Sequence, residues 1–300
     1  MSEKKSTLTR RDFIRGAGCA AVGVAVGLPV LAEEVAKEPV IKSRVVLIRN
    51  QGVVNDAGKI GSELVEQMLD DAMVALFGKE KPVDCWRQIV SAKDIVGIKS
   101  NVWKYLPTPP EVEQAIRKRL LEVGVAADNI SVDDRGVLGN GIFQKATALI
   151  NTRPMRTHAL SGVGGVIKNP IMFDPEPWTY HDNACASLAK IWNLPLVKDK
   201  VRLNVLVMLT PQFHNIGLHH FDPAYVWSYN GLIVSTDPVA ADSVGLRIIQ
   251  RKRQLVFGED RPLQPTAHHI ALADKEYHLG HSETNNIELI RLGWESDILI

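Results

Sequence analysis

The sequence predicts an α/β fold, with a mostly parallel sheet flanked by helices and an elaborated, loop-rich second half. In the first half, short continuous apolar runs, which are typical of strands buried on both faces, alternate with apolar residues at helical spacing. This alternation implies parallel strands joined by right-handed crossovers. The second half has two long loops rich in Pro, His, Trp and Tyr, and all nine histidines follow residue 157. Ordered loops of such length are usually functional.

The first-half elements follow from their apolar spacing. Residues 44–48 are the first predicted strand, and Ser62–Phe77 is a predicted helix that Gly78 can end in the left-handed conformation. The second strand is expected at 94–100 and the third at 129–133.

The remaining helices are predicted from their capping residues. Thr108 can cap the second helix, with Pro109 at its first position and Glu111 completing a capping box. A long helix in the second half begins with Asp237 as cap and Pro238 at its first position. The sequence also predicts strands at 201–209 and Gly231–Ser235.

The first residues have the form of a twin-arginine export signal. Arg10 and Arg11 stand beside Phe13, and a Gly/Ala-rich apolar run with a small-residue cleavage site follows. We expect residues 1–32 to be a signal peptide cleaved after Ala32, and residues 33–300 to be a single α/β domain in the periplasm. The Tat translocase is then a partner during export. The alternative, an N-terminal membrane anchor, needs about 20 apolar residues, and this run is shorter.

Charge and cysteine content exclude several classes of function. Removing residues 1–32 takes away five of the 35 basic and two of the 34 acidic residues, so the mature chain is close to neutral. We therefore expect no nucleic-acid partner, and no segment of the mature chain has the length and hydropathy of a membrane span. Its only cysteines are Cys85 and Cys185, which makes an iron–sulfur cluster held by this chain improbable. In an oxidising periplasm the two could instead form a disulfide.

The candidate catalytic residues are Lys99, His158 and Lys168. Lys99 stands at the carboxyl end of the second predicted strand, where parallel sheets place their ligands, although a lysine there can also extend to solvent without a role in binding. His158 follows a short predicted strand, and a glycine-containing loop separates it from Lys168. We expect the three to converge on one cleft around an anion, with His158 titrating near neutral pH as an acid, a base or a metal ligand. The alternative for His158 is local packing in a turn.

Three further residues are candidate substrate contacts. Asn101 lies two residues after Lys99, on the same face of an extended chain. Arg135 follows the third strand, and Asn169 follows Lys168 directly.

A divalent metal is a third expectation, carried by His181, Cys185 and His214. If the chain is helical from residue 182 onward, His181 and Cys185 share one face, as a soft metal pair or a histidine-activated thiolate. The alternative is a buried, unreactive Cys185 beside a surface histidine. His214 belongs to a loop with further donors, but its spacing fits no established zinc pattern, so a polar loop lining a cleft is the alternative there.

Several phrases together resemble a known family. In chain order they are Val96-Gly97-Ile98-Lys99-Ser100-Asn101, Val132-Asp133-Asp134-Arg135, Thr157-His158-Ala159-Leu160-Ser161-Gly162-Val163 with Lys168-Asn169, Tyr180-His181-Asp182-Asn183-Ala184-Cys185 and Ser235-Thr236-Asp237-Pro238-Val239-Ala240-Ala241-Asp242. They are similar to the blocks of the domain of unknown function 362 family, from about residue 45 to about residue 280. The leader resembles that of a twin-arginine-exported subgroup. Some family members carry a ferredoxin-like cysteine module, which this sequence lacks. That family has no settled activity.

Taken together, these features favour an exported periplasmic enzyme. We expect it to act on a small anionic or polar substrate in a cleft at the carboxyl edge of the sheet, with a divalent metal or another cofactor left open. The alternative is a non-enzymatic protein, either a solute-binding module or an accessory factor for a periplasmic redox complex. The residues alone do not decide between these classes.

Overall fold

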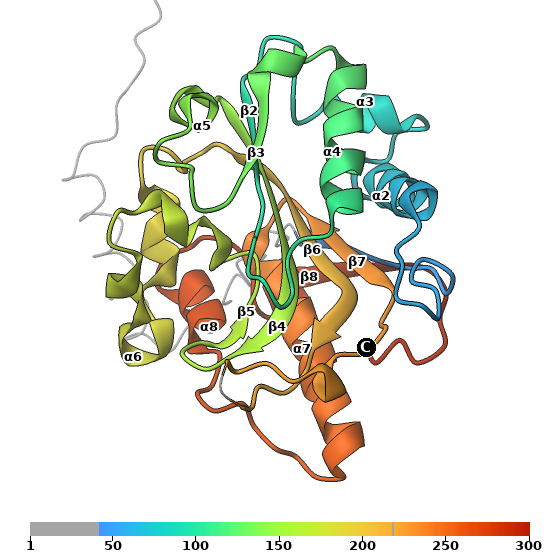
Figure 1. Ribbon diagram of the computed structural model, residues 1–300, viewed down its shortest axis with the longest axis vertical. Coiled ribbons are helices and arrows are strands. Elements are labelled where there is room, and N and C mark those ends of the chain that lie inside the picture. The colour runs from blue at the N-terminus through green and yellow to red at the C-terminus, as the bar shows by residue number, and fades with distance from the viewer. Residues whose placement is uncertain (1–41, 218) are drawn as a thin grey trace, which may run out of the picture. The chain divides into compact units, whose positions relative to one another are not determined.

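The computed structural model describes residues 42–217 and 219–300, which form an eight-stranded sheet between two layers of helices (Figure 1). The predicted export signal, with Arg10, Arg11 and the cleavage site after Ala32, lies outside the described residues. The strands are β1 Ser43–Arg49, β2 Val96–Lys99, β3 Ile130–Asp133, β4 Ala148–His158, β5 Gly162–Gly164, β6 Val201–Gln212, β7 Gly231–Ser235 and β8 Ile287–Gly293.

The strand order is β3-β2-β4-β6-β7-β1-β8, with the short β5 paired to β4. Four neighbouring pairs are parallel, whereas β7 is antiparallel to both β6 and β1, and β5 is antiparallel to β4. The predicted α/β fold with a mostly parallel sheet is therefore confirmed. The second and third strands are neighbours, as expected, but β4, β6 and β7 lie between them and β1.

Helices cover both faces of the sheet. They are α2 Ser62–Phe77, α3 Pro82–Trp86, α4 Pro110–Val123, α5 Gly141–Lys145, α6 Asp182–Cys185, α7 Pro238–Phe257 and α8 His268–Lys275. The short 3₁₀ helices are η1 Ala127–Asn129, η2 Asn169–Phe173, η3 Pro177–His181, η4 Leu188–Asn193, η5 Pro223–Tyr225 and η6 Thr284–Asn286. Figure 1 shows α2, α3 and α4 on one side of the sheet, and α5, α6 and α8 on the other.

Alternate residues of each strand enter two separate apolar cores. Val46 of β1 packs into the core under α2 and α4, and Leu47 packs into the core that includes α7. Cys85 belongs to the first core and Cys185 to the second, and both are free thiols. The disulfide that the sequence left open is therefore not formed, because the sheet separates the two residues.

The helix caps confirm two predictions and correct one. Gly78 ends α2 with a φ of 66°, and Asp237 caps α7 by accepting hydrogen bonds from the backbone N–H groups that open it. The capping box predicted at Thr108 is wrong, because α4 begins at Pro110 without a side-chain cap. The Thr108 hydroxyl instead accepts a hydrogen bond from the Asn101 N–H and donates one to the Thr152 carbonyl. It therefore joins the loop after β2 to β4.

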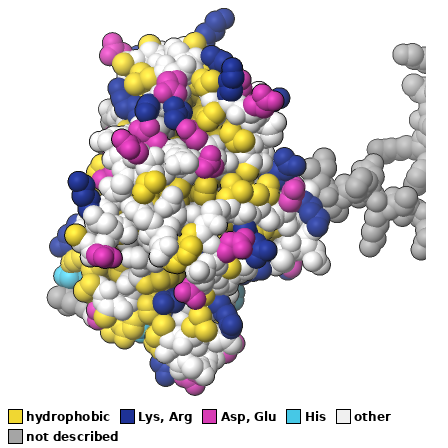
Figure 2. Space-filling view, turned by 90° about the vertical axis from the view of Figure 1, so that its right-hand side faces the viewer, with side chains coloured by type: hydrophobic (Ala, Val, Ile, Leu, Met, Phe, Trp, Pro, Cys, Tyr) yellow, Lys and Arg dark blue, Asp and Glu magenta, His cyan; other side chains and the backbone are white. Residues whose placement is uncertain are grey.

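The surface over α2 and α4 carries charges of both signs. Figure 2 shows this side of the molecule, with Lys and Arg interspersed among Asp and Glu. Ion pairs such as Arg119 with Asp70 link the two helices there. Among the described helices, none combines the length and the apolar character that crossing a bilayer would need.

Candidate functional site

A row of polar residues crosses the sheet at one register, where β2 ends. Lys99 pairs with Asp133 on one side and with Asn151 on the other, and the row continues through Asn204 to Ser235. The Asn151 amide donates a 2.9 Å hydrogen bond to Asn204, so these buried groups satisfy one another. Burying polar side chains costs free energy even when they are paired, so such a row inside a sheet points to a functional role.

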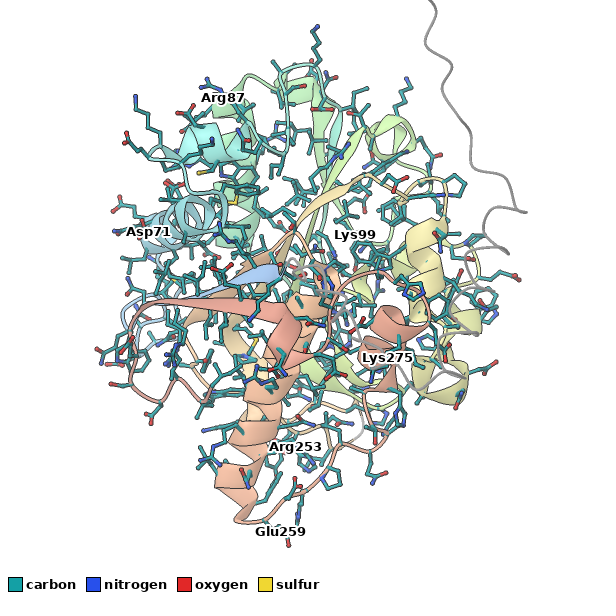
Figure 3. The ribbon with its side chains drawn as sticks, turned by 180° about the vertical axis from the view of Figure 1, so that it is seen from behind. Asp71, Arg87, Lys99, Arg253, Glu259 and Lys275 are labelled. Atoms are coloured by element: carbon teal, nitrogen blue, oxygen red, sulfur yellow. The ribbon has the colours of Figure 1, made fainter. Side chains whose placement is uncertain are left out.

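Lys99 is buried and forms an ion pair with Asp134 in the loop after β3. Its ammonium also donates a 2.8 Å hydrogen bond to the carbonyl of Ser100, and Asp134 accepts a second hydrogen bond from the Val102 N–H. Burial lowers the pKa of Lys99 to about 8, although Asp134 opposes the shift. Figure 3 shows Lys99 in the interior of the molecule, whereas Asp71 lies at the periphery. The charge of Lys99 is thus already neutralised by the protein.

Asn169 connects two of the predicted site residues. Its amide nitrogen donates to the Lys99 carbonyl at 3.0 Å and to Asn151 Oδ1 at 2.8 Å, and its oxygen accepts from Asn101 at 3.5 Å. The structure therefore brings Asn101 and Asn169 together at the end of β2. The described hydrogen bonds of Asn101 and Asn169 are made to other protein groups. These bonds hold in place the segment that carries Lys168.

Asp242 of α7 holds the same chain from the other side. Its carboxylate accepts hydrogen bonds from the backbone N–H groups of Val166, at 2.7 Å, and Ile167, at 2.9 Å. Asp242 is completely buried, and burial raises its pKa to about 7, with these two bonds acting in the opposite direction. Lys168 is thus positioned by its neighbours on both sides.

Lys168 and Cys185 lie side by side in the interior. The Lys168 ammonium is 3.6 Å from Cys185 Sγ, and Sγ is 3.3 Å from the carbonyl of Leu160. Burial lowers the pKa of Lys168 to about 8, and the sulfur opposes this shift. At neutral pH this lysine is therefore closer to exchanging its proton than an ordinary surface lysine.

The chain around Cys185 is not the regular helix that the sequence predicts. Asn183, Ala184 and Cys185 all have positive φ, of 47°, 53° and 62°. The left-handed region is unfavourable for residues other than glycine, and runs of it are found where the surroundings impose the conformation, often at functional sites. His181 and Cys185 therefore do not share a helical face, and Sγ is 4.0 Å from the backbone carbonyl of His181.

His158 ends β4 in a partly buried position, where it interacts electrostatically with Lys168. Burial lowers its pKa strongly, and the positive charges of Lys168, Arg156 and Arg153 add to the effect. This lowered pKa runs against the expectation that His158 titrates near neutral pH, because protonating it would add one more charge beside three buried cations. Its Nδ1 accepts a hydrogen bond from the Leu160 N–H at 3.1 Å, so the neutral ring carries its proton on Nε2. His158 can therefore act as a hydrogen-bond donor.

Two buried arginines of β4, Arg153 and Arg156, complete this cluster and were missed by the sequence analysis. Their exposed fractions are 3% and 8%, and the Nε atom of each has no hydrogen-bond partner in the described part of the chain. The Arg156 guanidinium stacks on Trp103, 3.8 Å from the ring centroid. Within residues 42–217 and 219–300, neither arginine forms an ion pair, and neither does Lys168. The signal that could have found them is two arginines inside a strand with apolar neighbours.

A family model matches the part of the chain that carries most of this cluster. Residues 137–247 match the domain of unknown function family DUF362. The resemblance is thereby confirmed over that span, whereas the motifs at 96–101 and 132–135 lie before it. No curated protein and no solved structure matches the chain. Within the DUF362 match lie β4, β5, Lys168, Cys185 and Asp242.

One further buried group packs against the DUF362 region from outside the match. His269 of α8 is fully buried, and neither of its ring nitrogens has a hydrogen-bond partner among the described residues. Burial lowers its pKa to about 3, and the charges of Lys168 and Arg153 contribute to the shift. His269 is therefore neutral at physiological pH and retains an unused N–H donor beside the two cations.

The other predicted site residues lie apart from this cluster. Arg135 is exposed on the turn after β3. His214 contacts Arg253, with 3.1 Å between His214 Nδ1 and Arg253 Nη1, and its ring lies edge-on to Tyr225. The described residues contain no group of three His, Cys, Asp or Glu side chains placed to hold a metal ion. A divalent metal at His181, Cys185 and His214 stays a prediction.

Proposed function

We propose that the protein is exported by the twin-arginine route and acts in the periplasm as an enzyme on a small anionic substrate. The substrate would bind at the carboxyl edge of the sheet, held by Arg153, Arg156 and Lys168. One observation carries this proposal: these three buried cations have no carboxylate partner in the described part of the chain.

The energetic argument is that an uncompensated buried charge destabilises a folded protein. Removing a cation from water costs several kcal/mol unless an anion and good hydrogen bonds offset the loss. Lys99 has Asp134 for this purpose, but Arg153, Arg156 and Lys168 form no such ion pair within residues 42–217 and 219–300. A bound anion would supply it, and guanidinium groups are well suited to oxyanions because they offer two parallel N–H donors.

The enzyme interpretation is supported by Lys168. Its pKa of about 8 allows it to give or accept a proton near neutral pH, next to a substrate that the arginines would hold. His158 would donate a hydrogen bond from Nε2 to the same substrate. Lys99 would act indirectly, since its ion pair with Asp134 and the Asn169 bond to its carbonyl keep the end of β2 in place.

The test is ligand binding followed by turnover. Protein purified from the periplasm is titrated calorimetrically with a panel of small carboxylates, phosphate and sulfate esters, and each ligand that binds is then followed by NMR. We expect at least one anion to bind and to be converted, with conversion lost in Lys168→Met. A ligand that binds and is recovered unchanged would favour the solute-binding alternative. Absence of any anion binding would refute the proposal.

A further inference from the structure

Within this proposed anion site, on which the inference rests, the geometry points to a ligand that carries two negative charges on its oxyanion groups. We infer that Arg153, Arg156 and Lys168 surround this group, and that His269 donates a neutral hydrogen bond to it. Phosphate, sulfate and small dicarboxylates share this chemistry.

The first argument is a comparison among the buried arginines. The Arg49 guanidinium lies between the rings of Tyr229 and Trp294, and it donates to the carbonyls of Tyr229 and Ser296. Arg253 donates to carbonyls of the loop after α7 and to the Phe213 carbonyl. The protein thus satisfies buried guanidinium groups where their role is structural.

Arg153 and Arg156 differ from this pattern. Hydrogen bonds from the Arg153 side chain are absent among the described residues, and Arg156 has a single long one, 3.4 Å from its Nη1 to the Thr157 carbonyl. Trp103 covers one face of the Arg156 guanidinium and leaves its N–H edge uncommitted. Their donors are therefore available to a ligand.

The second argument is that these groups converge from three elements. Arg156 and His158 of β4 pair in register with Gly164 and Gly162 of β5. A Cβ atom at Gly164 would come within 2.7 Å of the Arg153 guanidinium, so the arginine packs directly on this glycine. Figure 1 shows β5 beside the end of β4, with α8 next to it.

Gly162 brings the third element into place. Its Cα faces the backbone of residues 265–267, where a Cβ atom would lie 2.5 Å from the Pro265 carbonyl oxygen. This close approach positions the start of α8, and with it His269, against the loop that leads to Lys168. His269 is the only group of the cluster on α8, and both of its ring nitrogens lack a partner in the described part of the chain.

The third argument is the charge of the cluster. The two arginines and Lys168 contribute three positive charges. Arg153 interacts electrostatically with two buried carboxylates, Asp134, which already pairs with Lys99, and Asp242. The three imidazoles nearby, His158, His181 and His269, are neutral because their pKa values are lowered. Two positive charges remain, which a doubly charged anion would balance.

The experiment compares anions of different charge on the same protein. Protein freed of anions by dialysis is titrated at pH 7.5 and constant ionic strength with sulfate, inorganic phosphate and malonate, and in parallel with nitrate and acetate. We expect the doubly charged anions to bind at least tenfold more tightly than the singly charged ones, and to raise the melting temperature. Equal affinities would overturn the doubly charged class and leave the proposed function standing, whereas no binding by any of the five anions would overturn both.

Variants locate the site. Arg153→Met and Arg156→Met are each expected to weaken sulfate binding at least tenfold, while the anion-free melting temperature stays constant or rises because a repelling charge is removed. Arg253→Met is the matched control, since it removes a buried guanidinium whose hydrogen bonds are satisfied. It should lower the melting temperature without changing sulfate affinity.

Arg153→Lys, which keeps the positive charge and loses the two parallel N–H donors of the guanidinium, gives a second measurement should Arg153→Met not fold. His269→Leu should weaken binding severalfold. Wild-type sulfate affinity in every β4 variant would place the anion elsewhere.

Discussion

Asp242 on α7 accepts a 2.7 Å hydrogen bond from the backbone N–H of Val166, so a helix on one face of the sheet fixes the loop that presents Lys168. The same carboxylate accepts the Ile167 N–H. On the opposite side of this loop, Asn169 is hydrogen-bonded to the end of β2 and to the middle of β4. The loop is therefore anchored at Val166 and Ile167 before Lys168 and at Asn169 after it, which is the rigid support that a binding lysine requires.

Asp242→Ala should destabilise the protein and loosen this loop. Each buried N–H left without an acceptor costs about 1 to 3 kcal/mol, and Arg153 loses one of the two carboxylates that interact with it electrostatically. Asp242→Asn retains one acceptor oxygen and should be affected less. Urea unfolding measures the change, with the exposed Glu259→Ala as control, for which a change within about 0.5 kcal/mol is expected. Equal stability of Asp242→Ala and Glu259→Ala would contradict the assigned role.

Gly164→Ala should weaken anion binding by displacing Arg153. The new methyl group would lie 2.7 Å from the Arg153 Nη2 atom, and one of the two must move. Gly141→Ala is the matched control, since a Cβ there meets nothing within 4 Å. Calorimetric titration with sulfate should show at least a tenfold loss for Gly164→Ala and none for Gly141→Ala. If both variants bind as the wild type does, Arg153 is not a ligand contact.

The fold was largely predictable because its signals are local. The helix at Ser62–Phe77 has a complete apolar stripe and a terminal glycine, and Asp237 followed by Pro238 defines a helix start without reference to the rest of the chain. Thr108 carries an equally good local signal, yet its hydroxyl is used by Asn101 and Thr152 instead. Tertiary contacts override local preference there, and no local sequence pattern indicates which distant residues the Thr108 hydroxyl will contact.

The candidate site was predictable only where it follows strand ends. Lys99 was found because parallel sheets place ligands at their carboxyl edge. Arg153 and Arg156 lie inside a long strand, where Arg156 pairs with Gly164 of β5 and Arg153 packs on the same glycine. Periodicity does not indicate this contact with β5. His269 is more than a hundred residues from Lys168 along the chain and reaches it only through the packing of residues 265–267 on Gly162. The left-handed backbone at Ala184 and Cys185 runs against intrinsic preference and has no sequence signal.

Export should depend on the arginine pair near the start of the chain. Replacing both Arg10 and Arg11 with Lys keeps the charge but removes the twin-arginine motif, so we expect precursor to accumulate in the cytoplasm. Immunoblots of periplasmic and cytoplasmic fractions measure the distribution, and Lys4→Arg together with Lys5→Arg serves as a control outside the motif. Normal processing of the Arg10→Lys, Arg11→Lys variant would refute this route.

Because of Lys168, the free energy of unfolding should increase with pH in the alkaline range. Its pKa is about 8 in the folded protein, chiefly because of burial, and about 10.4 in an unfolded chain. Between these values the unfolded chain binds more protons than the folded one, so the free energy of unfolding increases with pH. A shift of this size corresponds to about 3 kcal/mol at 1.36 kcal/mol per pKa unit. Urea unfolding of wild type and Lys168→Met at pH 7.5 and 10 measures it.

The comparison of the two proteins isolates this lysine, because Lys99 also has a lowered pKa and contributes equally to both. The wild type should gain stability over the window relative to Lys168→Met, which should be the more stable of the two at pH 7.5 in anion-free buffer. Saturating sulfate at pH 7.5 should reduce that difference, since a bound anion favours the charged lysine. Parallel pH profiles of the two proteins would show that Lys168 remains an ordinary, fully protonated lysine and would remove the charge argument for the site.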